Sequence, residues 1–253
     1  MSMVHFVGAG PGAPDLITLR GKLLLEGADV VIYTGSLVNP KLLLDLRRES
    51  EVHNSAKMTL DEVVEIMKTA VGQGKTVVRL HTGDPSLYGA IREQMAKLSA
   101  LGIKYEICPG VSSFSAAAAA LKSEYTVPGI SQTVIITRAA GKTPVPKKES
   151  IRMLAAHGAT MILFLSAGLL ESVAKDLIAG GYGPNTPAAI VYKASWPQET
   201  IIRCTVSSLA KSAAENQISK TALVCIGDFL GDLYHLSRLY SPDFSTEYRG
   251  KKE

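Results

Sequence analysis

Residues 8–15 read GAGPGAPD, and residues 82–89 read TGDPSLYG. Each of these glycine-rich segments follows a short apolar run typical of a buried strand, Met3–Val7 before the first and Thr76–Leu80 before the second. Ligands of open α/β sheets bind at the carboxyl ends of the strands, where loops of this kind lie. Because glycine lets the backbone approach a ligand and proline restricts the loop, the two segments together predict one composite binding pocket.

The first segment also fits a dinucleotide-binding fingerprint, since Gly8, Gly10 and Ala13 match the pattern G-x-G-x-x-[GA] after a strand. Two prolines inside the segment, however, remove amide donors that would bind a pyrophosphate. The next predicted strand ends at Tyr33, with no Asp or Glu behind it to bind a ribose hydroxyl. A nicotinamide-dependent oxidoreductase stays an alternative of a different class, as does a tight turn that binds nothing.

The first half of the chain alternates between short apolar runs and helical patterns, which predicts a mostly parallel, doubly wound sheet. We expect its strands at Met3–Val7, Asp29–Tyr33, Thr76–His81 and Tyr105–Cys108. We expect its helices at Leu19–Glu26, Asn39–Leu46, Leu60–Val71, Ala90–Leu101 and through Ala116–Leu121. Thr59 and Glu62 have the spacing of a capping box for the third of these helices.

The second half starts a new α/β pattern after an aperiodic stretch around Pro128 and Gly129. We expect its strands at Thr133–Thr137, Thr160–Leu165, Ala188–Tyr192, Ile201–Thr205 and Ala222–Ile226, and its helices at Lys148–Ala156, Leu169–Ala179 and Leu209–Asn216. Two strands in direct succession predict a hairpin, and hence a mixed sheet. The expected organisation is two α/β domains, residues 1–121 and 132–235, with a linker at 122–131, a polar tail at 236–253 and the active site in the interdomain cleft.

Composition favours a globular enzyme. Of 253 residues, 46% are hydrophobic and 20% are charged, and no run reaches the roughly 20 apolar residues of a membrane span. A net charge of +4 and an aromatic content of 6% do not indicate a nucleic-acid-binding surface. Cys108, Cys204 and Cys225 lie far apart in apolar runs, without a metal-binding spacing. We therefore expect buried thiols, no metal site, no membrane or nucleic-acid partner and a cytoplasmic location.

Several motifs together indicate a family. Three segments resemble the tetrapyrrole methylases: GAGPGAPDLIT at residues 8–18, GDP at residues 83–85 together with Gly89, and PGVSS at residues 109–113. Within that family, YTGSLV at 33–38, HTGDPSLYGAIREQ at 81–94, SQTV at 131–134 and VYKASWP at 191–197 are similar to the branch that methylates carbon 11 of precorrin-4 or cobalt-precorrin-4. The resemblance covers about residues 3–230. One departure is Ala13, where the family commonly has Asp.

The resemblance implies S-adenosylmethionine as the methyl donor, a carboxylate-rich tetrapyrrole as the acceptor, a role in cobalamin biosynthesis and a homodimer. It leaves open whether the acceptor carries cobalt, because contacts to peripheral carboxylates need not sense the central metal. A methylase for another ring carbon stays the nearest alternative. A methyltransferase of the same fold that acts on ribosomal RNA or protein is another, although it would favour a more basic surface.

Carried over position by position, the resemblance places the donor against Pro11, Thr82, Gly83, Asp84, Leu87, Ser112, Ser113, Leu165 and Ala194. Asp84 is a candidate catalytic residue, since its carboxylate can balance the donor's positive charge or hold its amino group. Its alternative role is a helix cap, which is common for Asp before a proline.

Basic residues at strand ends suit the carboxylates of the acceptor. Arg138 and Lys193 each adjoin a predicted buried strand and are the candidates for this contact, and Arg138 is also a candidate catalytic residue. Lys147 and Lys148 are better explained as solvated loop charges. Gly10 and Gly12 flank Pro11 and are expected to contact the substrate ring.

Methyl transfer needs no covalent nucleophile from the protein, because the sulfonium donor is already activated. Alignment of donor and acceptor at about 3–3.5 Å could supply on the order of 7–11 kcal/mol of the barrier reduction. A site made of shape, backbone groups and a few carboxylates is therefore expected. His81 could act as a base, but a lone histidine at a strand end is more often structural, and Trp196 is expected to form either a cleft wall or part of the core.

Overall fold

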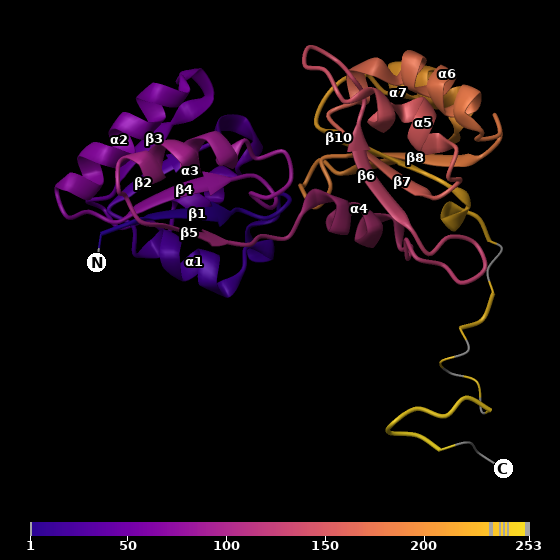
Figure 1. Cartoon of the computed structure of the whole chain (residues 1–253), viewed down its shortest axis with the longest axis horizontal. Helices are drawn as coiled ribbons and strands as arrows, with labels where there is room; N and C mark the ends of the chain where they lie inside the picture. The colour runs from indigo at the N-terminus through magenta and orange to yellow at the C-terminus, as the bar shows by residue number, and fades with distance from the viewer. Residues whose placement is uncertain (1, 233–234, 238, 240, 242, 251–253) are drawn as a thin grey trace. The chain divides into compact units, whose positions relative to one another are not determined.

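A computed structural model of the chain describes residues 2–232, 235–237, 239, 241 and 243–250. The chain forms two compact units, each with its own five-stranded sheet (Figure 1). The first unit comprises residues 1–117 and 193–199, and the second comprises residues 118–192 and 200–253. The segment 193–199 thus belongs to the first unit, although the strands on either side of it belong to the second. The domain limits, linker and tail expected from the sequence stay predictions, and positions 238, 240, 242 and 251–253 of that tail lie outside the described residues.

The first unit contains an all-parallel sheet with the strand order β3-β2-β4-β1-β5. Its strands are β1 (Val4–Gly8), β2 (Val30–Tyr33), β3 (Glu51–Asn54), β4 (Val77–His81) and β5 (Tyr105–Cys108). Its helices are α1 (Leu19–Glu26), α2 (Leu60–Gly72), α3 (Ile91–Ala100) and the first part of α4 (Ser113–Leu121). Helix α1 covers one face of the sheet, and α2 and α3 cover the other (Figure 1). The predicted doubly wound fold of this half is confirmed.

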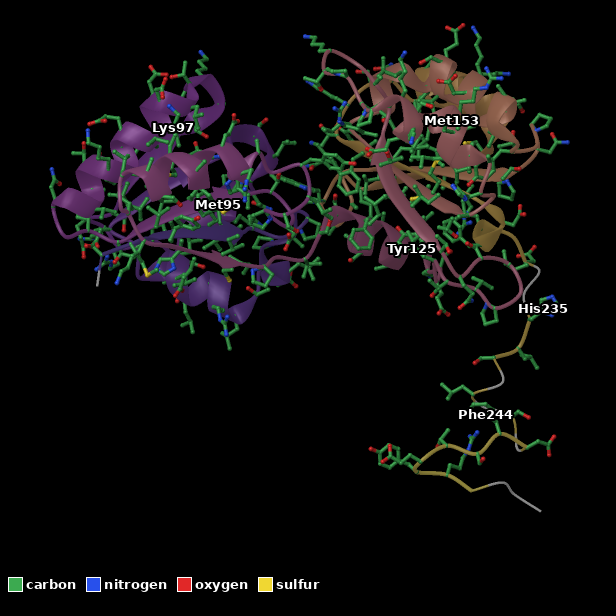
Figure 2. All side chains as sticks on the ribbon, viewed as in Figure 1. Met95, Lys97, Tyr125, Met153, His235 and Phe244 are labelled. Carbon is green, nitrogen blue, oxygen red and sulfur yellow. The ribbon has the colours of Figure 1, made fainter. Side chains whose placement is uncertain are left out.

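Successive residues of β1 point to opposite faces of the sheet and so belong to the two cores of this unit. Phe6 packs with Met67 of α2 and Leu98 of α3 on one face, and Val7 packs with Leu25 of α1 on the other. The predicted capping box at Thr59 is confirmed and begins α2. Lys97 of α3, labelled in Figure 2, forms an ion pair with Asp61 of α2.

The second unit contains a mixed sheet with the strand order β6-β7-β10-β8-β9. Its strands are β6 (Val134–Arg138), β7 (Thr160–Phe164), β8 (Pro187–Tyr192), β9 (Thr200–Thr205) and β10 (Ala222–Ile226), and its helices are α5 (Ile151–Ala155), α6 (Leu170–Gly180) and α7 (Leu209–Glu215). Strands β6 and β7 are parallel, and the other pairs are antiparallel. The predicted hairpin is β8–β9, so the mixed sheet is confirmed.

Two elements predicted from the sequence differ in the structure, and one strand was missed. The helix expected at Asn39–Leu46 is only a 3-10 turn at Pro40–Leu43. The helix expected at Lys148–Ala156 is shorter, because the hydroxyl of Ser150 accepts a hydrogen bond from the backbone N–H of Met153 and so begins α5 at Ile151. Strand β3 was not predicted, because it is an edge strand with mostly exposed side chains and no apolar run.

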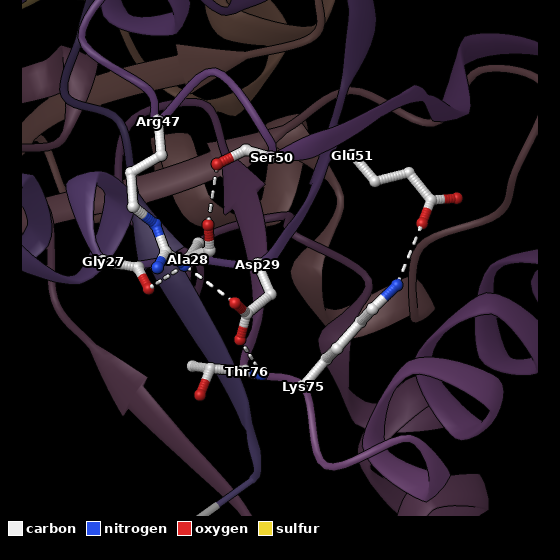
Figure 3. Close-up of polar contacts among 8 residues, drawn as sticks. All are labelled: Gly27, Ala28, Asp29, Arg47, Ser50, Glu51, Lys75 and Thr76. Carbon is white, nitrogen blue, oxygen red and sulfur yellow. Dashed lines mark hydrogen bonds and ion pairs between the residues drawn. The ribbon is translucent and has the colours of Figure 1, made fainter.

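Charged side chains hold together the amino ends of β2, β3 and β4 (Figure 3). The guanidinium of Arg47 donates 2.8 Å hydrogen bonds to the carbonyl of Gly27 and to the carboxylate of Asp29. The second carboxylate oxygen of Asp29 accepts from the backbone N–H of Thr76 at 2.7 Å. That hydrogen bond, together with Arg47, lowers the pKa of Asp29 despite the opposing effect of burial. We call this set of contacts, with the ion pair of Lys75 and Glu51, the amino-edge network.

The three cysteines are all free thiols. Cys108 and Cys225 are buried as predicted, whereas Cys204 is half-buried. Burial raises the pKa of Cys225 to about 12, which makes this thiol inert near neutral pH. Its sulfur lies 4.0 Å from the hydroxyl of Tyr125, which is labelled in Figure 2.

Candidate active site

The loops after β4, β1 and β5 lie side by side, because these three strands are neighbours in a parallel sheet. The two glycine-rich segments contact each other directly: the N–H of Gly83 donates to the carbonyl of Gly10 at 2.8 Å, and the N–H of Gly10 donates to the carbonyl of Gly83 at 3.3 Å. The N–H of Ala9 also donates to the carbonyl of His81 at 2.7 Å. The structure therefore brings together the two segments that the sequence had singled out.

Glycine is required where these loops meet. A Cβ atom at Gly8 would lie 2.5 Å from the Cα of Gly110 and 2.6 Å from the carbonyl oxygen of Gly83. Gly83 also has a positive φ of 59°, which L side chains rarely adopt. Three chain segments thus pack backbone against backbone, and we call Gly8, Gly83 and Gly110 the glycine contact. Sequence reasoning missed Gly110 as a packing residue, because its partners lie far away along the chain.

Asp84 ties two of these loops together. One carboxylate oxygen accepts hydrogen bonds from the backbone N–H of Ser86, at 2.8 Å, and from the Ser86 hydroxyl. The other accepts from the N–H of Gly110 at 2.8 Å. Burial raises the pKa of Asp84, but these hydrogen bonds outweigh it and leave the pKa below its usual value, so the group is a carboxylate at neutral pH. The helix-cap alternative was wrong, since residues 85–88 form a turn and the next helix, α3, begins only at Ile91.

The other predicted donor residues of the first unit gather around Gly83. The position of a Cβ atom on Gly83 lies 3.6 Å from the backbone nitrogen of Ser113, the first residue of α4, and 3.7 Å from the Cα of Ser112. Ser112 is buried, and Thr82 and Leu87 are half-buried. Backbone atoms of the loops after β4 and β5 thus lie close together at Gly83, and backbone polar groups of this kind can bind a small polar ligand.

The segment 193–199 packs against the first glycine-rich loop. The indole N–H of Trp196 donates to the carbonyl of Pro11 at 3.0 Å, and the hydroxyl of Ser195 accepts from the N–H of Ala13 at 3.0 Å. Ala194, a predicted donor residue, is buried in this segment. The ammonium of Lys193 lies 5.7 Å from the centroid of the Trp196 ring. The sequence left Trp196 as either a cleft wall or a core residue, and it assigned no role to Ser195.

Arg138 and Leu165 belong to the second unit, so the structure describes them apart from the other predicted site residues. They lie at the ends of the neighbouring strands β6 and β7, where Arg138 is paired with Phe164. The guanidinium of Arg138 donates to the carbonyls of Ala139, Thr143 and Pro144, at 3.2, 3.2 and 2.8 Å. Arg138 therefore shapes its own loop, which the sequence did not indicate. Leu165 is 70% exposed and has a positive φ of 52°.

His81 is buried at the end of β4 and has the properties of a structural residue. Burial, with the positive charge of Arg79, lowers its pKa to about 3, so the imidazole is neutral and a weak base. Its ring packs against Phe6 at a centroid distance of 6.0 Å. Within the described ranges, no three or more His, Cys, Asp or Glu side chains gather in a way that could hold a metal ion. No helix in those ranges is long and apolar enough to cross a membrane.

Comparison with known proteins identifies the family. The model of the tetrapyrrole (corrin/porphyrin) methylases matches residues 3–210. The chain belongs to the tetrapyrrole methylase family. It is 53% identical, over 97% of its length and 95% of the relative, to a cobalt-precorrin-4 C(11)-methyltransferase of Methanocaldococcus jannaschii. It is 46% identical, over 90% of its length and 91% of the relative, to a precorrin-4 C(11)-methyltransferase of Mycobacterium tuberculosis.

Solved structures of the family agree with this fold. A cobalt-precorrin-4 methyltransferase superposes with a TM-score of 0.89 at 48% identity, over 90% of this chain and 96% of that one. A uroporphyrin-III C-methyltransferase of Thermus thermophilus, solved with S-adenosylhomocysteine, superposes with a TM-score of 0.76 at 26% identity. The match covers 90% of this chain and 93% of that one. The family assignment argues against the nicotinamide alternative, and Gly8 of its fingerprint is required for packing against Gly83 and Gly110. The roles of the individual site residues stay predictions.

Proposed function

We propose that this tetrapyrrole methylase transfers the methyl group of S-adenosylmethionine to carbon 11 of precorrin-4 or cobalt-precorrin-4 in cobalamin biosynthesis. The observation that carries the proposal is the similarity to C(11)-methyltransferases, at 53% and 46% identity over at least 90% of the chain. The geometry supports it, because the carboxyl edge of the first sheet brings the glycine-rich loops together beside the ionised carboxylate of Asp84.

The donor supplies an activated methyl group, and the chain's residues bind and orient it. We assign this binding to Pro11, Thr82, Gly83, Asp84, Leu87, Ser112, Ser113, Leu165 and Ala194. The packing at Gly83 supports the assignment, since a Cβ atom there would lie only 3.6 Å from the backbone nitrogen of Ser113 and 3.7 Å from the Cα of Ser112. Asp84 keeps its negative charge because of its lowered pKa, and this charge favours a cationic donor nearby.

Arg138 and Lys193 are our candidates for binding the carboxylates of the acceptor. Both are half-buried, and partial burial strengthens the attraction between a cation and a carboxylate. The three carbonyl contacts of Arg138 restrain its guanidinium without neutralising its charge. Gly10 and Gly12 are proposed to let the ring approach the backbone beside Pro11. A shift of about 1 Å in the clamped ring would cost rate heavily, so these contacts select the carbon that reacts.

We also propose that the enzyme is a cytoplasmic homodimer that works without a metal, a membrane or a nucleic-acid partner. The free thiols support a reducing compartment. Light scattering at micromolar concentration should give twice the chain mass of 26.9 kDa. A mass of 26.9 kDa would contradict the dimer and leave the catalytic proposal intact.

The proposed activity is tested by incubating the purified chain with isotopically labelled S-adenosylmethionine and precorrin-4 or its cobalt form. Mass spectrometry should find one labelled methyl group on the tetrapyrrole. Calorimetry should show binding of S-adenosylhomocysteine and none of NAD. Absence of transfer to any tetrapyrrole would contradict the proposal, and methylation of ribosomal RNA or protein under the same conditions would favour that alternative.

A further inference from the structure

Three consecutive residues of the first glycine-rich loop are each held by a side chain from elsewhere. The carbonyl of Gly12 accepts a 2.8 Å hydrogen bond from the buried amide of Asn39, between the contacts that Trp196 makes to Pro11 and Ser195 makes to Ala13. These three side chains, Asn39, Ser195 and Trp196, form what we call the loop clamp. Every residue from 11 to 13 therefore has a backbone polar group fixed from outside the loop.

Trp196 contacts the loop through its shape as well as its N–H. A Cβ atom at Gly12 would lie 2.8 Å from the Cγ of Trp196 and closer still to Cδ1 and Nε1. The indole therefore occupies the space that any other residue at position 12 would need. The loop and the ring are fitted to each other, and neither can move far without the other.

The segment that carries the ring is itself restrained. The N–H of Ser195 donates to the carboxylate of Glu199 at 2.7 Å, and the N–H of Trp196 donates to the carbonyl of Lys193 at 3.0 Å. Lys193 and Ser195 both have positive φ, 46° and 67°, although neither is glycine. Such strained backbone persists only where surrounding contacts over-determine it, most often at functional sites.

We infer that Trp196 is a positioning residue that sets the donor loop and the acceptor-binding cation relative to each other. Its N–H fixes the carbonyl of Pro11, which is assigned to the donor, and its ring face holds the ammonium of Lys193, which is assigned to the acceptor. The inference rests on the proposed function for those two assignments. One rigid side chain thus contacts both a residue assigned to the donor and a residue assigned to the acceptor.

The test uses the fact that Trp196 is the chain's single tryptophan, so that a tryptophan analogue supplied during expression alters this position alone. An analogue with sulfur in place of the indole N–H keeps the ring but removes the donor to Pro11. A series of fluorinated tryptophans keeps the N–H but progressively weakens the attraction between the ring face and a cation. Each arm thus removes one of the two contacts with little change of shape.

The two arms have different expected results. Without the N–H, the affinity for S-adenosylhomocysteine should fall about fivefold, the effect of one net hydrogen bond. Fluorination should raise the KM for the tetrapyrrole by about two- to fivefold and leave the affinity for S-adenosylhomocysteine unchanged. A residue that only supports the fold would instead lower the thermal stability and move both readouts together.

An unchanged affinity in the sulfur analogue would overturn the link to Pro11, and an unchanged KM across the fluorinated series would overturn the link to Lys193. A parallel change of both readouts in both arms would overturn the inference as a whole. Failure of the proposed function is distinguishable, because an enzyme that binds S-adenosylhomocysteine but methylates no tetrapyrrole still allows the first arm to be measured.

A glycine pair gives a second, independent check of the loop clamp. Gly12→Ala should displace Trp196 and shift its fluorescence, whereas Gly72→Ala, at a glycine with nothing within 4 Å of the added methyl group, should not. An identical spectrum for Gly12→Ala and the unmodified protein would contradict the fit of ring and loop.

Discussion

The two edges of the parallel sheet in the first unit are built by different means. At the amino edge, charged side chains bond to one another and to backbone groups, with Asp29 accepting from both Arg47 and Thr76. At the carboxyl edge, the three residues of the glycine contact bring backbone against backbone, and the carboxylate of Asp84 ties two loops together. The same strands thus end in two different ways. Side-chain contacts stabilise the amino edge, whereas close backbone packing at glycines stabilises most of the carboxyl edge.

The difference separates stability from binding. Side chains that bond to each other use up their polar groups, so the amino-edge network can strengthen the fold but offers little to a ligand. At the carboxyl edge, glycine lets the loops approach each other and keeps backbone polar groups close to a ligand. Because all strands are parallel, every such loop falls at the same edge, where ligands of these folds bind. Substitutions at the two edges should therefore give different kinds of effect.

The largest effect should come from Gly110→Ala. The new methyl group would lie 2.7 Å from the Cα of Gly8 and would also collide with the carbonyl oxygen of Gly83. Since both neighbours are backbone, the loops must separate, at a cost of about 1–3 kcal/mol in the free energy of unfolding and occasionally more. Urea unfolding followed by the fluorescence of Trp196 reports on this unit, and Gly72→Ala is the matched control. Equal midpoints for the two variants would show that the glycine contact is not required.

Asp84→Ala should act mainly on binding. It removes the hydrogen bonds from Ser86 and Gly110 that hold the two loops, together with the negative charge. We expect the affinity for S-adenosylhomocysteine, measured by calorimetry, to fall by about 1–3 kcal/mol, the effect of a lost charge-assisted contact. If the affinity is unchanged while the protein is less stable, Asp84 only supports the fold.

Asp29→Ala should have the smallest effect, on stability alone. The loss should be about 1 kcal/mol or less, because the pair with Arg47 is partly exposed. The folded-state pKa of Asp29 is lowered, so its contribution is present above the unfolded pKa of about 3.9 and disappears as the pH falls through the folded value. The gap in unfolding free energy between the unmodified protein and the variant should therefore be constant from neutral pH to about pH 5 and shrink below about pH 4. A weakened affinity for S-adenosylhomocysteine would contradict the separation of the two edges.

Most of the fold could be predicted from the sequence, because buried strands such as β1 and β4 are continuous apolar runs and helices such as α2 begin at clear caps. The exposed edge strand β3 could not, since it has no apolar pattern. For the site, the glycine-rich loops were predictable because strand order in a parallel sheet brings their ends together.

The contacts within the site were not predictable. Ser195 bonds to Ala13 across 182 positions of the chain, and nothing in either local sequence indicates the other. Arg138 was correctly placed at a strand end, but its bonds to the carbonyls of its own loop depend on a backbone path that residue types do not specify. Sequence patterns predict at which end of the sheet the loops lie, whereas the hydrogen-bond partners of individual polar atoms can be identified only from the structure.

The central claim is that this tetrapyrrole methylase acts on one particular carbon. The most direct measurement incubates the enzyme with donor carrying a 13C-labelled methyl group and a precorrin-4-type tetrapyrrole, and then locates the label by NMR. A single labelled methyl group is expected on carbon 11. A label on another ring carbon would contradict the substrate assignment and preserve methyl transfer, and no label on any tetrapyrrole would contradict the account as a whole.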